Sequence, residues 1–263
     1  MEYFKTCRGI PVYISDTKKG EKTVVLLHGY LETGEVWANF TELLKPHFRV
    51  IVMDLPGNGL SGTNRSENSM EFMADVVAEV LNHSEIDRAT IVGHSMGGYA
   101  ALAFAEKYGE LTEKLCLFHS TPNPDTEEKK QNRDREAALV EEGKLNMILN
   151  VNIANMFADE NLRRMRDAVA MISENAGISE PEGIVACLKG MKNRKDMNPF
   201  LAGFDKPLLL IFGRKDKYIS ENTAAGLIEK FPNAEILMLE NSGHAGFLEE
   251  PEICAQKLIE FIK

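Results

Sequence analysis

Residues 89–105, ATIVGHSMGGYAALAFA, place a serine between an apolar run and an alanine-rich run. Ala89–Val92 has the length and composition of a buried strand, and the alanine-rich run is compatible with a helix. Gly93 and Gly97 flank Ser95 at the positions where a side chain would collide with the strand or the helix in a sharp turn. Such a turn lifts the serine hydroxyl clear of a sheet. The stretch therefore predicts Ser95 as a nucleophile.

The rest of the chain repeats this alternation of strand and helix. Six apolar runs without polar alternation predict strands buried on both faces. They are Thr23–Leu27, Val50–Met53, Ala89–Val92, Lys114–Phe118, Pro207–Phe212 and Ala234–Leu239. Helical patterns between them indicate an α/β fold, with a mostly parallel sheet covered by helices on both faces. Polar, glycine-rich segments follow five of the runs, and we expect them to meet in one crevice at the carboxyl edge of the sheet.

A serine hydroxyl is a weak nucleophile near neutral pH, so it needs a base and an acid that orients the base. Among the six histidines, His244 lies just past the last strand with a glycine before it, and it is the expected base. Asp216 follows the preceding strand, in the segment GRKDK, and is the expected acid. Asp54 and, more weakly, Glu240 are rivals for the acid, and His119 is a rival for the base.

Charge that develops on the substrate oxygen needs hydrogen-bond donors. The backbone N–H of Met96 directly follows the candidate nucleophile, and the backbone N–H of Tyr30 lies in the loop after the first strand. We expect these two groups to form an oxyanion hole. His28, in the same loop, is expected to brace it.

Composition excludes several classes of protein. The chain has 263 residues and a net charge of −10, and an acidic chain repels the phosphate backbone of nucleic acids. The four cysteines form no close pair, which predicts reduced thiols, a cytoplasmic location and no metal site. We recognise neither a signal peptide nor an apolar run long enough to span a membrane.

Residues 121–203 break the alternation and contain no convincing strand. A helical insertion of this length is usually functional. Six of the twelve methionines lie in it, which indicates either a pliable apolar roof over a substrate or ordinary helix packing. Its arginines could bind a carboxylate, but most are expected to face solvent beside the many acids; they are Arg133, Arg135, Arg163, Arg164 and Arg166.

Together these segments resemble the α/β-hydrolase family, in its single-domain form with a helical cap. The matching segments are His28-Gly29-Tyr30 with Trp37, residues 54–61 (DLPGNGLS), residues 93–98 (GHSMGG), residues 213–216 (GRKD) and Gly243-His244 leading into Glu249-Glu250-Pro251. The chain order Ser95, Asp216, His244 is the order that this fold requires. One departure is Asn58, where many relatives carry a histidine that is not catalytic.

The resemblance implies the domain organisation. It gives a mostly parallel, eight-stranded sheet whose first antiparallel strands come from about Met1 to Ile14. Residues 1–120 and 204–263 would form the core, and residues 121–203 the cap.

The leading functional hypothesis is a serine hydrolase that cleaves carboxylic esters of small or medium-sized molecules through an acyl-enzyme, without a cofactor. Hydrolases of carbon–carbon bonds share the same three residues. The menaquinone-pathway synthase of the superfamily is a further alternative, but it usually has arginine where this chain has Tyr99, which argues against it. Epoxide hydrolases and haloalkane dehalogenases require an aspartate nucleophile, so Ser95 argues against both. Aminopeptidases bind a substrate amine through cap carboxylates, for which Glu141 or Glu142 is available. A non-enzymatic ligand receptor is the alternative of another class; the oligomeric state stays open.

Overall fold

The computed structural model describes residues 1–263 and contains one eight-stranded sheet, in the order β1-β2-β4-β3-β5-β6-β7-β8. The strands are β1 (Glu2–Cys7), β2 (Ile10–Asp16), β3 (Thr23–Leu27), β4 (Arg49–Met53), β5 (Ala89–His94), β6 (Thr112–Phe118), β7 (Leu208–Gly213) and β8 (Glu235–Leu239). β2 pairs antiparallel with β1 and β4, and the remaining pairs are parallel. The predicted fold class and the antiparallel start are therefore confirmed.

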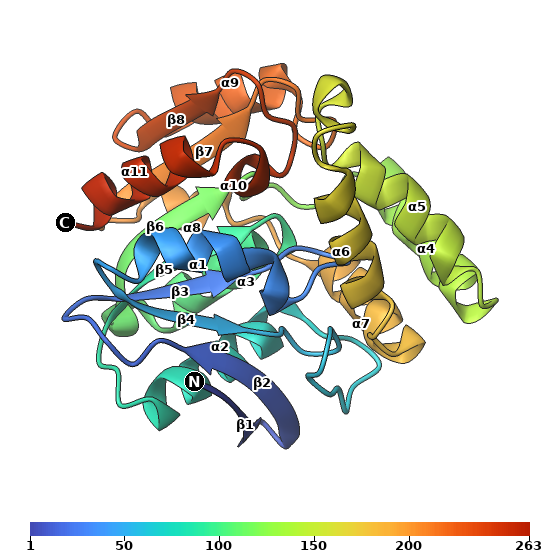
Figure 1. Cartoon of the computed structure of the whole chain (residues 1–263), viewed down its shortest axis with the longest axis horizontal. Helices are drawn as coiled ribbons and strands as arrows, with labels where there is room; N and C mark the ends of the chain where they lie inside the picture. Colours follow the sequence, from blue (N-terminus) through green and yellow to red (C-terminus); the bar gives the residue numbers. More distant parts are fainter.

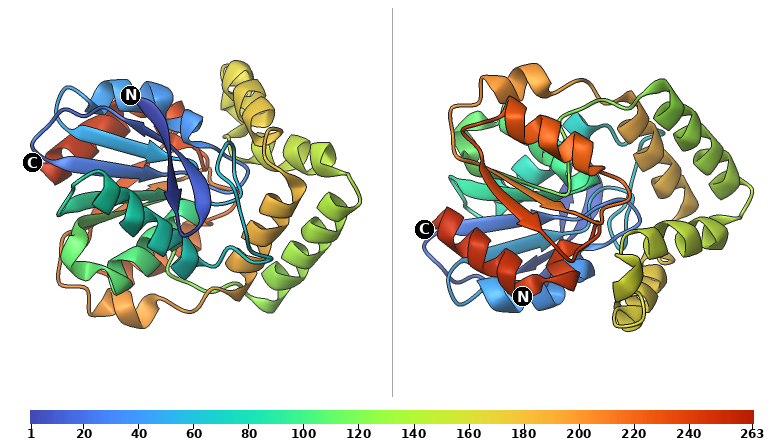
Figure 2. Two further views of the ribbon diagram at one scale, coloured as in Figure 1. Left: turned by 90° about the horizontal axis from the view of Figure 1, so that it is seen from below. Right: turned by 90° about the horizontal axis from the view of Figure 1, so that it is seen from above.

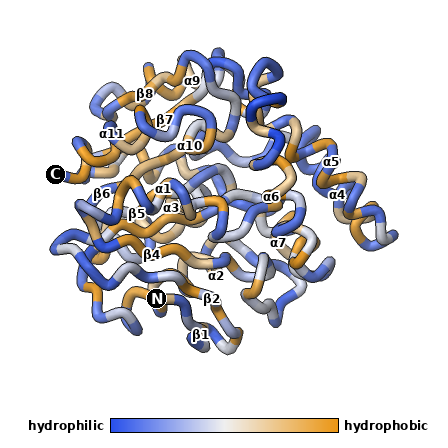
Figure 3. Tube along the Cα trace, viewed as in Figure 1, coloured by the Kyte–Doolittle hydropathy of each residue, from blue (hydrophilic) through white to orange (hydrophobic).

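Burial explains why the strands read as continuous apolar runs. Every residue of β3 and β5, at the centre of the sheet, is buried. Figure 3 shows apolar residues following the strands through the interior, while the outer helices mix apolar and polar residues. A strand buried on both faces has no solvent side on which polar residues would alternate.

Helices cover both faces of the sheet. Those of the sheet region are α1 (Ala38–Leu44), α2 (Met70–His83), α3 (Met96–Lys107), α9 (Glu221–Lys230), α10 (Gly246–Glu249) and α11 (Pro251–Ile262), with short 3₁₀ turns η1 (Gly34–Trp37) and η2 (Gly109–Leu111). α1 packs beside α11 on one face, and α2 packs beside α3 on the other (Figure 2).

The strand order creates the site for a ligand. From β3 the chain moves to β4 on one side and then crosses to β5 on the other. In open α/β sheets this reversal leaves a crevice beyond the carboxyl ends of the strands. The strands point toward this crevice and toward the helices of residues 121–203 (Figures 1 and 2).

Residues 121–203 contain helices and no strand. The helices are α4 (Glu127–Glu141), α5 (Leu145–Asn155), α6 (Arg166–Ala176), α7 (Pro181–Asn193) and α8 (Asn198–Ala202), with a 3₁₀ turn η3 (Asp159–Asn161). α4 packs along α7, and α4 to α7 lie beyond the carboxyl edge of the sheet (Figure 1). The division into core and cap stays a prediction about domains.

Two expectations from composition can also be compared with the structure. All four cysteines are free and buried. None of the helices has both the length and the apolar character needed to cross a bilayer.

Candidate active site

Ser95 occupies the sharp turn between β5 and α3. Its backbone has φ 49° and ψ −114°, a left-handed conformation that costs an L-residue about 1–3 kcal/mol. β6 holds the turn in place, because the Ser95 N–H donates to the Phe118 carbonyl over 3.0 Å. The Ser120 hydroxyl donates to the Ser95 carbonyl over 2.7 Å. The position of the serine is therefore fixed by the sheet.

Two glycines make the turn possible. A Cβ on Gly93 would overlap the Gly97 carbonyl, and a Cβ on Gly97 would overlap the carbonyl oxygens of Leu27 and His28. The strand, the helix and the first loop thus approach Ser95 more closely than any side chain at these two positions would allow.

Asp216 and His244 meet at the ends of neighbouring strands. His244 Nδ1 lies 2.7 Å from Asp216 Oδ2. The other carboxylate oxygen, Oδ1, accepts the backbone N–H groups of Tyr218 and Ile219 at 2.8 and 3.0 Å. The carboxylate is therefore held by its own turn, and it directs the opposite ring nitrogen of His244, Nε2, away from itself.

His119 is a second imidazole on Asp216. Its Nδ1 lies 3.2 Å from Asp216 Oδ2, and its Nε2 accepts the Gly246 N–H over 3.2 Å. Burial lowers the pKa of His119 to about 4, so the ring is neutral near pH 7 and carries one proton. Because Nε2 accepts, that proton lies on Nδ1 and is donated to Asp216. A single carboxylate oxygen therefore serves two imidazoles.

These contacts keep Asp216 ionised. Burial alone would raise the pKa of Asp216, but the charge interaction with His244 and the hydrogen bonds of His119 and His244 lower it well below its ordinary value. A charged carboxylate is the state required of a group that orients a histidine base and stabilises its imidazolium form.

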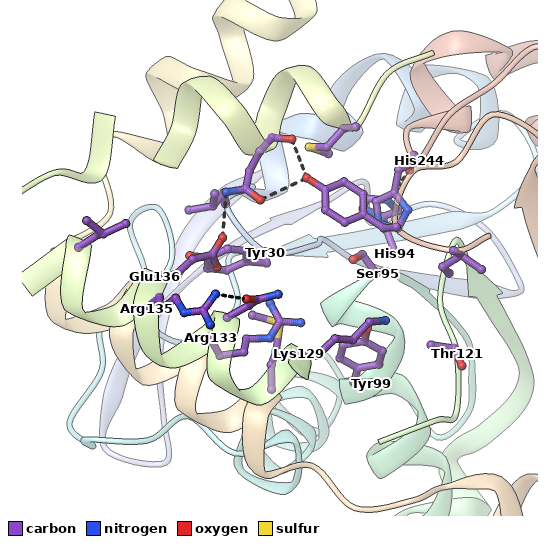
Figure 4. A pocket seen from close by; sticks show the side chains of 18 residues that line it. Tyr30, His94, Ser95, Tyr99, Thr121, Lys129, Arg133, Arg135, Glu136 and His244 are labelled. Carbon is purple, nitrogen blue, oxygen red and sulfur yellow. Dashed lines mark hydrogen bonds between the residues drawn. The ribbon is translucent and has the colours of Figure 1, made fainter. Parts of the chain in front are cut away.

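Ser95 and His244 line the same cavity, which has a volume of about 470 Å³ (Figure 4). Within the chain, only the backbone atoms of Ser95 take part in hydrogen bonds. Bonds between nucleophile and base are often long in unliganded sites and tighten when substrate binds. The structure brings the two side chains to one cavity, and the proton transfer between them stays a prediction.

The two amides predicted for the oxyanion hole are available. Met96 is the first residue of α3, and Tyr30 lines the cavity. Neither backbone N–H donates to a group within the chain. Free N–H groups at a helix start beside a nucleophile can stabilise an anionic oxygen.

His94 precedes Ser95 in sequence and binds elsewhere. Its Nδ1 lies 2.9 Å from Glu32 Oε2, and its Nε2 lies 2.8 Å from the His244 carbonyl oxygen. Both partners are acceptors, so His94 carries two protons and is charged. Burial would lower the pKa of His94, but the Glu32 carboxylate raises it, and the same pairing lowers the pKa of Glu32 against the effect of burial. This buried ion pair anchors the backbone of the candidate base.

The rival acids and His28 have other partners. Asp54 accepts two backbone N–H groups at 2.7 and 2.8 Å, as expected of a residue that caps a turn. His28, in the loop after β3, accepts the N–H of Leu55 at its Nε2 over 2.9 Å, which ties that loop to the loop after β4. Glu240 pairs with Arg214 over 2.6 Å on the surface. None of these acidic side chains lines the cavity.

Two walls enclose the cavity (Figure 4). The sheet-edge wall consists of Tyr30, Leu31, His94, Ser95, Tyr99, Thr121, Tyr218, Ile219 and His244. The cap wall consists of Lys129, Asn132, Arg133, Arg135, Glu136, Leu139, Asn152, Met156 and Met191.

The cap wall corrects three expectations. Arg133, expected in solvent, lines the cavity with its side chain only 20% exposed. Glu141 and Glu142, considered as ligands for an amine, are exposed, and Glu136 is the carboxylate that lines the cavity. Of the six methionines between residues 121 and 203, only two reach the cavity, so the methionine-rich roof is limited to Met156 and Met191.

Tyr218 links the two walls. Its ring centroid lies 4.8 Å from that of His244, and its hydroxyl donates to Asn152, whose carbonyl oxygen is 2.9 Å away. The Asn152 amide in turn donates to Glu136 over 3.1 Å. Tyr218 was not predicted from the sequence, in which the only signal for it is its place two residues after Asp216.

Glu249 in α10 was also missed as a contact between the His244 loop and residues 121–203. Its Oε2 accepts the Gly243 N–H over 2.7 Å. Its Oε1 accepts the Ala158 N–H at 2.9 Å and the Asn161 side-chain amide at 2.8 Å. One buried carboxylate thus fixes the loop that carries the candidate base against the end of the cap.

One group of side chains has the spacing of metal ligands. The ligand atoms of His119, Asp216 and His244 lie within 4.8 Å of one another. Both Nδ1 atoms are already directed at the same Asp216 oxygen, so hydrogen bonds account for the cluster.

Comparison with known proteins agrees with this geometry. A family model described as alpha/beta hydrolase fold matches residues 22–251. A 2-hydroxy-6-oxononadienedioate/2-hydroxy-6-oxononatrienedioate hydrolase of Paraburkholderia phymatum is 31% identical, over 95% of this chain and 90% of its own. A pimeloyl-[acyl-carrier protein] methyl ester esterase of Vibrio vulnificus is 26% identical, over 90% of this chain and 93% of its own.

A thermophilic esterase from Thermogutta terrifontis, solved with malate bound, superposes with a TM-score of 0.93. It is 29% identical and covers 99% of this chain and 97% of its own. An enol-lactonase from Burkholderia xenovorans shares the fold, with a TM-score of 0.90 at 20% identity and coverage of 98% of this chain and 99% of its own.

Proposed function

This chain belongs to the α/β-hydrolase fold family and is a hydrolase, and we propose that it cleaves carboxylic esters of small or medium-sized molecules with Ser95, His244 and Asp216. The observation that carries the proposal is the 2.7 Å contact between Asp216 and His244 Nδ1, in a structure where His244 and Ser95 line one cavity. This contact leaves Nε2 of His244 free of Asp216, and we assign the Ser95 proton to that nitrogen.

In the proposed reaction, His244 Nε2 takes the proton of Ser95 as Oγ attacks the ester carbonyl. The N–H groups of Tyr30 and Met96 donate to the carbonyl oxygen as it becomes negative. The bond to the alcohol breaks, the alcohol leaves with the proton from His244, and an acyl-enzyme remains. His244 then takes a proton from water as the water oxygen attacks the acyl carbonyl. The bond between that carbon and Ser95 Oγ breaks, the acid leaves, and His244 returns the proton to Oγ.

The test is a fluorophosphonate probe together with p-nitrophenyl esters of short acids. We expect labelling of Ser95 and ester turnover, and Ser95→Ala should lose the labelling and about 10⁴-fold or more of the turnover. Ser220→Ala is the matched control, because Ser220 caps α9 outside the cavity and should leave both readouts intact. Ester cleavage that persists in Ser95→Ala would remove the mechanism.

Carbon–carbon bond hydrolysis is the second candidate. The 31% identical relative, named as a hydrolase of a 2-hydroxy-6-oxo-dienedioate, favours it. The same residues would hydrolyse a carbon–carbon bond in a substrate of that class, and the reaction would be followed by the loss of the absorbance of its dienol. Turnover of this substrate that exceeds turnover of every ester would replace the esterase proposal. Absence of turnover and of labelling with all substrates would support the ligand-receptor alternative instead.

A further inference from the structure

The cap wall is positively charged in an acidic protein. The chain carries a net charge of −10, yet the cavity is lined by the cations Lys129, Arg133 and Arg135 and by one carboxylate, Glu136. These four side chains extend from α4 toward the space beside Tyr30 and Ser95 (Figure 4). Cations gathered in a cavity raise the local concentration and affinity of anionic ligands.

The fixed part of this charge is a pair of arginines that share one acid. Arg133 Nε lies 3.1 Å from Asp125 Oδ2, and Arg194 Nη1 lies 2.7 Å from Asp125 Oδ1. The Asp125 side chain is fully buried, and Arg194 stacks on the Tyr99 ring at 3.9 Å. Asp125 balances one of the two guanidinium groups. Glu136 is the only carboxylate among the cavity-lining residues, against the further cations Lys129 and Arg135, so this side of the cavity keeps a net positive charge.

That positive charge faces the cavity through unpartnered donors. Arg133 uses only Nε within the chain, so the N–H groups of Nη1 and Nη2 donate to no protein atom. The Tyr30 hydroxyl is buried and also has no hydrogen-bond partner. Tyr30 and Arg133 line the same cavity, so the two groups lie in one region (Figure 4). Of these free donors the Tyr30 hydroxyl is the buried one, and buried donors are normally paired, so an acceptor supplied by a ligand would complete the site.

We propose that Arg133 and Tyr30 form a subsite for a carboxylate carried by the substrate, separate from the ester that Ser95 attacks. The planar fork of an arginine held at Nε offers two parallel N–H donors, which match the two oxygens of a carboxylate. Glu136 remains tied to Asn152. A substrate ammonium group would meet the net positive charge of the cap wall and is disfavoured. The preferred substrate class is thus the monoester of a dicarboxylic acid.

The inference rests on the proposed esterase function, so the test compares charged and neutral esters. Mono-p-nitrophenyl esters of succinic to suberic acid are measured against the p-nitrophenyl esters of the corresponding monocarboxylic acids. We expect kcat/KM to favour the charged ester at one chain length by about 10-fold or more. Arg133→Gln should lower kcat/KM for that ester about 10- to 100-fold and for its neutral counterpart less than about threefold.

Two further variants make this result specific. Tyr30→Phe keeps the backbone N–H and should reduce kcat/KM for the charged ester by about three- to tenfold. Arg166→Gln removes the same charge from an arginine side chain that is 81% exposed and outside the cavity, and should leave the preference unchanged. In Arg133→Gln the buried Asp125 carboxylate still pairs with Arg194. If the glutamine variant fails to fold, Arg133→Lys is measured in its place. The lysine variant should retain part of the preference.

Binding separates failure of the subsite from failure of the reaction. Calorimetry of Ser95→Ala with adipate and with hexanoate should show binding of adipate that is lost when Arg133→Gln is added. Binding of adipate by Ser95→Ala, combined with no turnover of any ester by the wild-type protein, would refute the esterase proposal and keep the subsite. Equal turnover of charged and neutral esters at every length, or an equal loss of both in Arg133→Gln, would overturn the carboxylate subsite and keep the esterase.

Discussion

The two walls of the cavity differ in how their polar groups are bonded. Behind the sheet-edge wall, Asp216 receives two imidazoles and two backbone N–H groups, and on the wall itself His94 is bonded through both ring nitrogens. On the cap wall, the terminal amino groups of Arg133 have no partner within the chain.

The difference separates two tasks. Groups that must be positioned before a reaction are best held by bonds within the protein, because positioning then costs nothing when substrate arrives. Groups that choose a substrate must keep donors free for it. We therefore expect the rate to depend on the bonded groups at and behind the sheet-edge wall, and substrate choice to depend on the free donors of Arg133 and Tyr30.

The largest effect is expected from Asp216→Asn. Asparagine has one acceptor oxygen, which cannot serve both the two imidazoles and the two backbone N–H groups. With its NH₂ turned toward the imidazoles it favours the wrong tautomer of His244, so kcat should fall about 10⁴-fold while the protein stays folded. Steady-state kinetics with a p-nitrophenyl ester, together with a thermal unfolding curve, measures both quantities.

Asp54→Asn is the matched control. Asp54 also accepts two backbone N–H groups, but it does so outside the cavity, so the change should lower stability and leave most of kcat. If Asp54→Asn abolishes turnover and Asp216→Asn does not, the assignment of the acid is wrong.

A smaller loss is expected from His119→Phe, which keeps an aromatic ring and removes the donor to Asp216 Oδ2. One hydrogen bond to a charged group is worth about 1.5–3 kcal/mol, and we expect about a 10-fold loss of kcat. The acid limb of the kcat/KM profile should move to higher pH, because Asp216 then attracts the proton of the base more strongly.

The control for His119 is an asparagine. His119 has φ 47°, a backbone conformation that asparagine tolerates, and the Asn amide places a donor near the position of Nδ1. His119→Asn should recover most of the rate and restore the pH profile. Loss of stability in both variants without any movement of the profile would assign His119 a merely structural role.

The contrast between the walls also explains what the sequence could predict. β3 matches its apolar run at Thr23–Leu27, and β7 (Leu208–Gly213) differs from its run by one residue at each end. Buried strands carry a continuous signal, and the candidate residues follow strands whose ends meet at one edge. Position along the chain was therefore enough to nominate Ser95, Asp216 and His244, and their roles stay predictions.

Partnerships between distant residues had no such signal. Glu32 and His94 are 62 positions apart and meet only because their loops converge at the edge of the sheet. α4 is charged around most of its circumference, so no periodicity showed that Arg133 faces inward. Its partner Asp125 lies before the helix and reads as an ordinary polar residue.

The smallest effect on rate is expected from Glu32→Gln, which tests the buried ion pair that Glu32 forms with His94 of the sheet-edge wall. Glu32 Oε2 accepts from both Gly29 and His94, while Oε1 is buried without a partner. The amide oxygen of glutamine can replace Oε2 and its NH₂ can occupy the place of Oε1. The substitution thus removes the charge with little change of shape, and kcat should stay within about threefold.

Stability should change with pH in a way that identifies the pair. The pKa of Glu32 is lowered in the folded state, so its contribution is present above its ordinary value of 4.5 and is lost as pH falls. The pKa of His94 is raised, so its contribution is complete below its ordinary value of 6.5 and is lost as pH rises through the folded value. The free energy of unfolding of wild type and of Glu32→Gln is measured in urea from pH 4 to 10. The two free energies should differ most, by about 2 kcal/mol, between pH 4.5 and pH 6.5. A difference in unfolding free energy that is constant from pH 4 to 10 would mean that His94 is neutral and forms no ion pair with Glu32, so that the contact depends on shape alone.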